Sequence, residues 1–570
     1  MPRDRSDSVE GSATEPSSAD EAPAVPPPKR SARAVTTIVE SEPSKPAQAK
    51  GAAPTRRSTR VASQTVSAEA SKPATKKPTS RKGAQKDEAD MAQLEEKLKK
   101  VKLEAKPKPA KPAHEHQGEY FNGLLQVNQA DVKDIIESQV FVWGAGNAGQ
   151  FGMGTEHTGE FKRPRKNTAI EEMIKAGKFG KKGLGFVALA AGGMSSLFVD
   201  YNGTIWSCGA NDDAALGRQT KDVPHPTKKK AVLDDEELSC SLHPLQSLID
   251  EGFRAVQVTA GDSIGAAISD KGDLRVWGTF RASGGVLGFS GGLMHQFLPI
   301  PVLELKSKPG DVEKFVEVAA GNDHVVVLTT HGNVYTWGVG ERGQLGRKVL
   351  ERHKIHATSP ERIVIGKRST RVVFIGAGAY TSFAVDEFCN VWGWGANNCG
   401  QTGTGFVNGS TDMEVHLPKR VLGLCPEDLG SDAHVTKIAG GDDHTLFLTS
   451  QGDVYACGLS LNGRLGLASD DPAFEERTIP DFLDKPVLVT FPDDVVIIDI
   501  SAGTRTSMAI SDMGVLYMWG EGAQSELGAG DAEVLETPTP IAPKGRWLAT
   551  AGACGGQHTL ALFREPETTS

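Results

Sequence analysis

Three glycines, Gly338, Gly340 and Gly343, form the pattern G-x-G-x-x-G, which in other proteins binds the pyrophosphate of a dinucleotide. That chemistry needs a helix starting at the third glycine, whose N-terminus holds the phosphates. It also needs an acidic residue roughly 20 positions later for the ribose. The residues that follow Gly343 do not support such a site. The spacing of these glycines must therefore have another origin.

The chain offers no other pattern for bond-making catalysis. It contains no P-loop, no H-E-x-x-H metal motif and no arrangement typical of a nucleophilic triad. Its seven cysteines are scattered, and none forms a C-x-x-C pair. This favours a reducing compartment with buried thiols and argues against a zinc site. The sequence thus predicts a non-enzymatic protein that uses no cofactor and no metal.

The glycine pattern recurs seven times. A Trp-Gly or Cys-Gly pair ends each copy's strand-like run, and intervals of 57 to 69 residues separate the glycines at 144, 209, 278, 338, 395, 458 and 520. Each copy after the first follows a small residue, a glycine and then alternating apolar residues, as in "AAGNDHVVVLTT". Alternation of period two, joined by short turns such as "HG", predicts hairpin strands. A fixed period of this size indicates a repeat architecture.

The two ends of the repeat array are incomplete in complementary ways. The first Trp-Gly strand, 140–144, has no Ala-Gly element before it, and the last Ala-Gly type element, 553–563, has no Trp-Gly strand after it. Pairing the two would close a ring and remove open sheet edges. We therefore predict an all-β fold, a seven-bladed β-propeller of regularly repeated units, over residues 138–563.

Outside this region we predict a disordered basic N-terminal arm at 1–118, a lead-in segment at 119–137 and a C-terminal tail at 564–570. The arm is rich in Pro, Ala, Ser and Lys, a composition that cannot bury enough apolar surface to offset chain entropy. It holds 23 Lys and Arg against 16 Asp and Glu, whereas the whole chain has a net charge of −9, which leaves the remainder near −16. Such an arm suits phosphates or an acidic protein surface, or serves only as a solvated tether. The chain shows neither a signal peptide nor an apolar run long enough to span a membrane.

The combined pattern, A-G-x-x-H followed by a strand ending in Trp-Gly and then by G-Q-L-G, resembles the regulator of chromosome condensation family. The resemblance covers nearly all of 138–563, and "TAGDSIGAAISDKGDLRVWGTFRASGGVLGFS" is among its closest stretches. It implies a nuclear, chromatin-associated guanine-nucleotide exchange factor for the small GTPase Ran, which promotes GDP release and GTP loading in support of nucleocytoplasmic transport and mitosis. One propeller face would bind Ran, and the other face and the arm would contact nucleosomes or DNA. The protein would act as a monomer, without a membrane partner.

The resemblance also assigns roles to individual positions. A wedge that helps to eject nucleotide matches the one loop that breaks the G-Q-L-G form, which consists of Ala282, Ser283, Gly284, Gly285, Val286, Leu287, Gly288 and Phe289. Residues expected to engage the GTPase are Asp262, Asp323, Asp443, Arg347, Asn398, His558 and Asn147. Two of them depart from the family pattern, because Asp443 stands in place of a histidine and Asn147 in place of an acidic residue. Arm residues expected to contact chromatin are Lys76, Lys77, Arg81 and Lys82.

The same repeat residues admit structural roles. The histidines at 324, 444 and 558 could join adjacent blade turns by hydrogen bonds, and Asp323 and Asp443 could be solvated turn carboxylates. The tryptophans of the Trp-Gly pairs are expected to pack in the core or between blades. The alternative function is a propeller scaffold for protein–protein interaction without exchange activity, as in ubiquitin-ligase or signalling relatives. The sequence shows no ligase or kinase segment, which argues against most proteins of that kind.

Overall fold

The computed structural model describes residues 137–180, 184–306, 308–406, 413–430, 433–475, 481–492 and 495–566. The predicted arm at 1–118, with Lys76, Lys77, Arg81 and Lys82, lies outside these residues. The lead-in segment before Glu137 and the last four residues of the chain also lie outside them.

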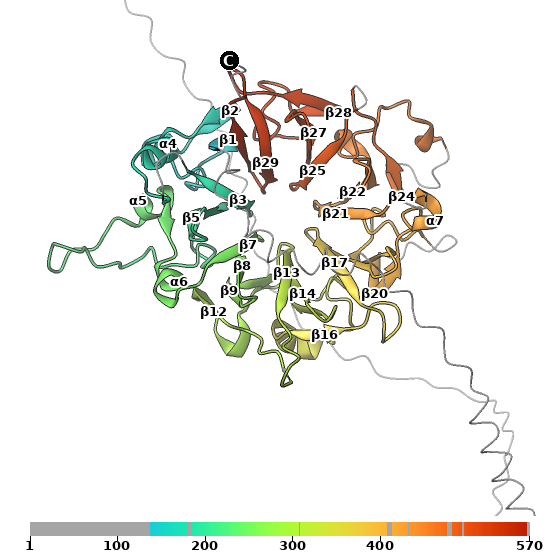
Figure 1. The fold of residues 1–570 in the computed structure, drawn as a ribbon, viewed down its shortest axis with the longest axis horizontal. Coiled ribbons are helices and arrows are strands. Elements are labelled where there is room, and N and C mark those ends of the chain that lie inside the picture. Colours follow the sequence, from blue (N-terminus) through green and yellow to red (C-terminus); the bar gives the residue numbers. More distant parts are fainter. Residues whose placement is uncertain are drawn as a thin grey trace, which may run out of the picture. The chain divides into compact units, whose positions relative to one another are not determined.

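Seven four-stranded antiparallel sheets surround a central axis in the described part of the chain (Figure 1). The strands nearest the axis are β3, β7, β13, β17, β21, β25 and β29. The predicted all-β fold, a seven-bladed β-propeller, is confirmed.

The first three blades along the chain are listed from the inner to the outer strand. Blade 1 contains β3 (Phe186–Ala191), β4 (Ser195–Asp200), β5 (Ile205–Gly209) and β6 (His243–Pro244). Blade 2 contains β7 (Ala255–Ala260), β8 (Ile264–Ser269), β9 (Leu274–Gly278) and β12 (Gln296–Ile300). Blade 3 contains β13 (Phe315–Ala320), β14 (His324–Thr329), β15 (Val334–Gly338) and β16 (Glu361–Ile363).

The remaining blades follow the same order. Blade 4 contains β17 (Val372–Ala377), β18 (Thr381–Asp386), β19 (Val391–Ala396) and β20 (Glu414–Arg420). Blade 5 contains β21 (Val435–Gly440), β22 (His444–Thr449), β23 (Val454–Leu459) and β24 (Phe482–Leu488). Blade 6 contains β25 (Ile497–Ala502), β26 (Thr506–Ser511), β27 (Leu516–Glu521) and β28 (Val534–Ile541). The closing blade contains β29 (Leu548–Cys554), β30 (His558–Arg564), β1 (Gln139–Ala145) and β2 (Glu160–Lys166).

Short helices lie in the connections between strands. The α-helices among the described residues are α4 (Thr168–Lys175), α5 (Asp235–Cys240), α6 (Gln246–Glu251) and α7 (Pro426–Leu429). The 3₁₀ turns are η1 (Thr155–His157), η2 (Ser290–Gly292), η3 (Glu351–Thr358), η4 (Leu461–Gly463) and η5 (Pro472–Phe474). Among the described residues, no helix has the length and apolar character needed to cross a membrane.

The ring closes by pairing the two ends of the repeat array. β1 pairs with β30 over a continuous register from Gln139 opposite Phe563 to Gly144 opposite His558. β1 also pairs with β2 on its other side. The N-terminal strand therefore completes the last blade, as the two incomplete repeats predict.

Burial explains the composition of the second strand in each blade. All six residues of β14, with the sequence HVVVLT, are buried, because neighbouring blades cover both faces of the sheet. The corresponding strands β4, β8, β18, β22 and β26 show the same complete burial. These strands supply the hydrophobic clusters between blades.

The glycine of each Trp-Gly pair permits a close approach between a strand and the neighbouring turn. Gly338 has a φ of 118°, and a Cβ atom there would lie 2.5 Å from the carbonyl oxygen of Asp323. Gly458 has a φ of 113°, and a Cβ atom there would lie 2.3 Å from the carbonyl oxygen of Asp443. Only glycine fits this geometry. Gly338 of the opening pattern thus lets its strand pass close to the acidic turn at Asp323, whereas Gly340 and Gly343 approach Val349 and His416.

A hydrogen bond between blades repeats around the ring. The indole Nε1 of Trp394 donates to the carbonyl oxygen of Gln344 in the preceding blade at 3.0 Å, and Trp143, Trp277 and Trp519 make equivalent bonds. Cys208 and Cys457, which replace tryptophan, direct their thiols at the equivalent carbonyls. The predicted packing role of these positions is confirmed. Within the described chain, Trp337 Nε1 has no acceptor, because the preceding blade 2 lacks the G-Q-L-G loop.

Candidate GTPase-binding face

Antiparallel connectivity gathers the predicted site residues on one face of the ring. In every blade the turn between the first and second strands and the loop between the third and fourth strands leave the same end of the sheet. Asp262, Asp323 and Asp443 lie on such turns, and Asn147, Arg347 and Asn398 lie on such loops. The seven turns surround the axis together. We call this end of the propeller the wedge face.

A separate two-stranded hairpin emerges from blade 2 on the wedge face. Its strands are β10 (Phe280–Ala282) and β11 (Gly285–Gly288), with Ala282 opposite Gly285 next to the tip. The tip residues 283–285 are exposed. At the base, the buried rings of Phe280 and Phe289 stack with centroids 6.1 Å apart. The segment predicted as a wedge is thus a hairpin with a packed base and an open tip, which we call the wedge hairpin.

Carboxylates of two neighbouring blades fix the wedge hairpin. The backbone N–H of Arg281 donates to Asp323 Oδ1 of blade 3 at 2.7 Å, and the N–H of Ser283 donates to Glu341 Oε2 at 2.9 Å. On the other side, the Arg281 guanidinium forms an ion pair with Asp213 of blade 1. Acidic groups on both sides therefore set the direction of the hairpin.

An acidic hollow of about 690 Å³ opens on the wedge face beside the hairpin. Two arginines, Arg281 and Arg505, line it together with a larger set of acids, which are Asp212, Asp213, Asp262, Asp442, Glu521 and Glu526. We call this space the acidic hollow. Its charge suits a basic surface of a partner protein.

The acids of this region are held partly desolvated. Burial raises the pKa of Asp323 to about 7, opposed by the hydrogen bond from the Arg281 N–H. Burial raises the pKa of Asp442 to about 6, and the neighbouring carboxylates of Asp443 and Asp262 add to the rise. Asp262 is an exposed residue, but the walls of the hollow reduce the hydration of its carboxyl and raise its pKa, against the effect of Arg281. A cation from a partner would relieve this unfavourable ionisation.

Comparison with known proteins identifies the fold family. The sequence model of a family described as "RCC1-like domain" matches residues 139–561. This chain belongs to the RCC1-like family. The match extends from the closing strand β1 into the last strand β30, so it covers all seven blades of the RCC1-like propeller.

Named relatives share most of their length with this RCC1-like chain. Protein pim1 of Schizosaccharomyces pombe is 31% identical over 495 residues, which cover 84% of each chain. The guanine nucleotide exchange factor SRM1 of Saccharomyces cerevisiae is 30% identical over 467 residues, covering 76% of this chain and 89% of that protein. The crystal structure of Prp20p from Saccharomyces cerevisiae, described with its binding properties to Gsp1p and histones, matches with a TM-score of 0.64. It is 28% identical and covers 76% of this chain and 92% of that one.

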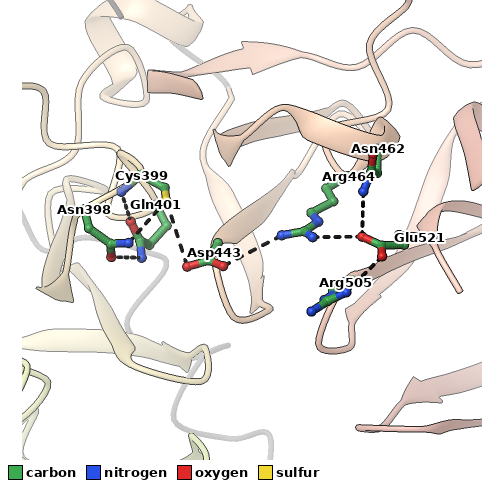
Figure 2. Close-up of polar contacts among 8 residues, drawn as sticks. All are labelled: Asn398, Cys399, Gln401, Asp443, Asn462, Arg464, Arg505 and Glu521. Carbon is green, nitrogen blue, oxygen red and sulfur yellow. Dashed lines mark hydrogen bonds and ion pairs between the residues drawn. The ribbon is translucent and has the colours of Figure 1, made fainter. Parts of the chain in front are cut away.

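The departure of Asp443 from the family pattern has a structural counterpart in this RCC1-like protein (Figure 2). Asp443 Oδ2 lies 3.7 Å from Nη1 of Arg464, and its Oδ1 lies 4.0 Å from the thiol of Cys399. Next to that thiol, Asn398 accepts a hydrogen bond from Gln401 at 3.0 Å. The structure therefore brings Asp443 and Asn398 to neighbouring positions at the junction of blades 4 and 5.

Two other predicted residues lie apart from this cluster on the RCC1-like ring. Arg347 Nη1 forms an ion pair of 2.9 Å with Glu361, and among the described residues its Nε and Nη2 have no hydrogen-bond partner. Direct contact with a GTPase would require Arg347 to exchange or share this partner. Asn147 is exposed near the start of the loop between β1 and β2.

His558 is placed as a link between blades of the RCC1-like ring. Its side chain is fully buried, and its Nε2 lies 2.8 Å from the hydroxyl of Ser196 in blade 1. His324 and His444 make equivalent contacts with Ser382 and Ser507. Burial lowers the pKa of His558 to about 3, so its imidazole is neutral at physiological pH. The prediction that His558 touches the GTPase is not supported by this placement, because a fully buried ring has no surface to offer a partner.

The residues missed from the sequence are Asp213, Arg281, Asp442, Arg464, Arg505 and Glu521. Three of them share a signal, since they change the charge at a fixed position of the repeat. Arg464 stands where other loops have glutamine, Glu521 directly follows a Trp-Gly pair, and Asp213 lies where the loop of blade 3 has Arg342. Comparing the seven copies column by column would have found these three.

Proposed function

We propose that this protein is a guanine-nucleotide exchange factor for the small GTPase Ran. The observation that carries the proposal is the wedge hairpin, which stands beside an acidic hollow on one face of an RCC1-like propeller. A relative 30% identical over most of its length is named a guanine nucleotide exchange factor. Exchange makes and breaks no covalent bond, so the site needs charged groups and a steric element in place of a nucleophile.

The proposed mechanism follows from how GTPases hold their ligand. A lysine and Mg²⁺ neutralise the phosphates of the bound nucleotide. Carboxylates of the wedge face, including Asp262, Asp323 and Asp443, would pair with basic residues of the GTPase and so dock its phosphate site beside the wedge hairpin. The wedge hairpin would enter the space beside the phosphate site. The coupling between the two binding events is reciprocal. A protein surface that binds the nucleotide-free GTPase more tightly therefore lowers the affinity of the GTPase for its nucleotide.

Nuclear and chromatin association are part of the same proposal. A similar crystal structure is described with binding to histones, and another is described as Kap60 bound to yeast RCC1. Residues 1–118 of this chain carry an excess of seven positive charges. We propose that this arm, with the propeller face opposite the wedge face, holds the protein on nucleosomes or DNA in support of nucleocytoplasmic transport and mitosis.

Shortening the wedge hairpin tests the exchange function directly. A variant in which 282–287 become a short Gly-Ser turn keeps Phe289 and its stacking on Phe280. We expect the maximal rate of nucleotide release from Ran to fall at least about tenfold, a barrier increase of about 1.4 kcal/mol. The KM for Ran·GDP should stay within about twofold, because the docking carboxylates remain. A folded variant with the full maximal rate would contradict the role of the hairpin.

Replacing Lys76, Lys77, Arg81 and Lys82 with alanine tests the arm. Binding through phosphates releases counterions, so retention on DNA or nucleosomes should weaken with rising salt and show little base preference. The variant should be retained less well at every salt concentration, while its exchange rate on free Ran is unchanged. If retention on DNA or nucleosomes changed neither with salt concentration nor with these four substitutions, a charge-based role for the arm would be excluded.

A further inference from the structure

Arg464 breaks the repeat at a position with a recurring local geometry in the other loops. Where glutamine occupies this position, its Oε1 accepts the backbone N–H two residues earlier, at 2.8 to 2.9 Å, in the loops of Gln150, Gln344 and Gln401. A guanidinium carries no acceptor and cannot make this bond. The side chain of Arg464 therefore has a different task from that of the glutamines.

The contacts of Arg464 are directed at two acids (Figure 2). Its side chain is only 7% exposed, with Nη2 at 2.9 Å from Glu521 Oε2 and Nη1 at 3.7 Å from Asp443 Oδ2. Its backbone is also fixed, because the carbonyl oxygen accepts bonds from Trp519 Nε1 and Ser507 Oγ of blade 6. A buried guanidinium with a fixed backbone and one firm ion pair can move little.

Glu521 is the closer of the two acidic partners of Arg464. It accepts hydrogen bonds from Asn462 Nδ2 and Arg505 Nη1, both at 2.8 Å, in addition to the pair with Arg464. These contacts, led by the bond from Asn462, lower the pKa of Glu521 to about 2. Glu521 is therefore ionised throughout the physiological range and fixes the guanidinium from the side of the acidic hollow.

Asp443 lies on the other side of the same guanidinium. Its side chain is 35% exposed on the wedge face, so part of the carboxylate is open to a partner. The adjacent Asp442 is crowded by acids, and the charge of Arg464 opposes the rise in its pKa. An aspartate in this acidic surface thus stands beside a cation that is buried and held at the junction of blades 5 and 6.

We infer that Arg464 and Glu521 are positioning residues that hold the Asp443 carboxylate in place to dock a basic group of the GTPase. Glu521 fixes the guanidinium of Arg464, and Arg464 in turn fixes Asp443. The three residues replace the histidine of the family pattern as one connected unit, in which a single buried cation lies between two acids. This inference rests on the proposed exchange function.

A double-substitution cycle on the full chain tests the unit. Steady-state exchange on Ran·GDP is measured for wild type, Arg464→Gln, Asp443→Asn and the double variant. We expect each single substitution to raise KM about fivefold with the maximal rate nearly unchanged, a size typical of coupled neighbours. The double variant should have the same KM as the Asp443→Asn variant, since Arg464 acts only through Asp443. Additive losses, or losses in the maximal rate alone, would overturn the inference.

Further variants separate positioning from folding. Glu521→Gln keeps Arg464 but weakens its hold, and should raise KM in the wild-type background and leave it unchanged in the Asp443→Asn background. Arg464→Lys, which retains the charge, should recover part of the affinity that Arg464→Gln loses. A Glu521→Gln effect of equal size in both backgrounds would overturn the inference even if Arg464→Gln failed to fold.

The wild-type protein distinguishes this inference from the function on which it rests. If wild type releases nucleotide from Ran but the cycle is additive, only the positioning role fails. If wild type does not release nucleotide at all, the proposed function fails and the inference fails with it.

Discussion

A fragment that begins at Gln150 should not form a stable ring. It lacks β1, which pairs with β30 from Gln139 to Gly144 and carries the buried side chains of Phe141 and Trp143. Removing a buried large aromatic side chain costs about 3–5 kcal/mol. Two such losses approach the whole stability of about 5–15 kcal/mol that a typical domain has. Thermal melting followed by circular dichroism should show no cooperative transition, or one far below that of the full chain.

The matched control is a fragment that begins at Glu137 and retains β1. It should melt within a few degrees of the full chain, because every described blade contact is preserved. A fragment from Gln150 that melted at the temperature of the full chain would show that the pairing of β1 with β30 does not stabilise the ring.

Replacing Asp323 with alanine should slow nucleotide release from Ran at least about tenfold, because one charge-assisted contact contributes about 1.5–3 kcal/mol. The resemblance assigns Asp323 to GTPase engagement and residues 282–289 to the wedge, as two different elements. The structure couples them, since Asp323 Oδ1 accepts the N–H of Arg281 at the base of the wedge hairpin. Asp323→Ala should therefore raise KM and also lower the maximal rate, while the melting temperature changes little.

Asp323→Asn separates the two effects of Asp323. An amide oxygen can still accept the Arg281 N–H, so this variant should raise KM and keep the maximal rate. Burial raises the pKa of Asp323 to about 7, so the wild-type carboxyl is largely protonated at pH 6 and ionised at pH 8. The kcat/KM of wild type should therefore rise with pH across this interval, because the pH dependence of kcat/KM reports the ionisation of groups in the free protein. The amide that replaces the carboxyl cannot ionise, so the variant should match wild type at pH 6 and fall behind at pH 8. A constant ratio would contradict the role of the charge.

The propeller ring and the wedge hairpin could be predicted from the sequence, because the repeat defines the first and an irregular copy of the repeat marks the second. Seven copies of the Trp-Gly strand define the blades, and the incomplete copies at 140–144 and 553–563 define the closure. The segment at 282–289 stands out because its loop is the only one of the seven without a glycine eight positions after the glycine of the Trp-Gly or Cys-Gly pair. Both the regular spacing of the repeat copies and the irregular loop can be recognised in a single sequence.

Contacts between blades could not be predicted in this way. The ion pair of Arg464 with Glu521 joins residues 57 positions apart, and its geometry depends on how blades 5 and 6 meet. The ion pair of Arg347 lies within one blade, but its partner Glu361 on the outer strand follows a connection whose path the repeat does not define. His558 was ambiguous from sequence, because a buried link between blades and an exposed contact use the same repeat position.

The most direct test of the proposed function is the release of fluorescent GDP from Ran. Wild-type protein at substoichiometric concentration should accelerate release at least about tenfold over the intrinsic rate, which corresponds to a barrier lowered by about 1.4 kcal/mol. An unrelated small GTPase in the same assay should release its nucleotide at its intrinsic rate. Release from Ran at the intrinsic rate, in the presence of folded protein, would contradict the exchange function and favour a propeller scaffold.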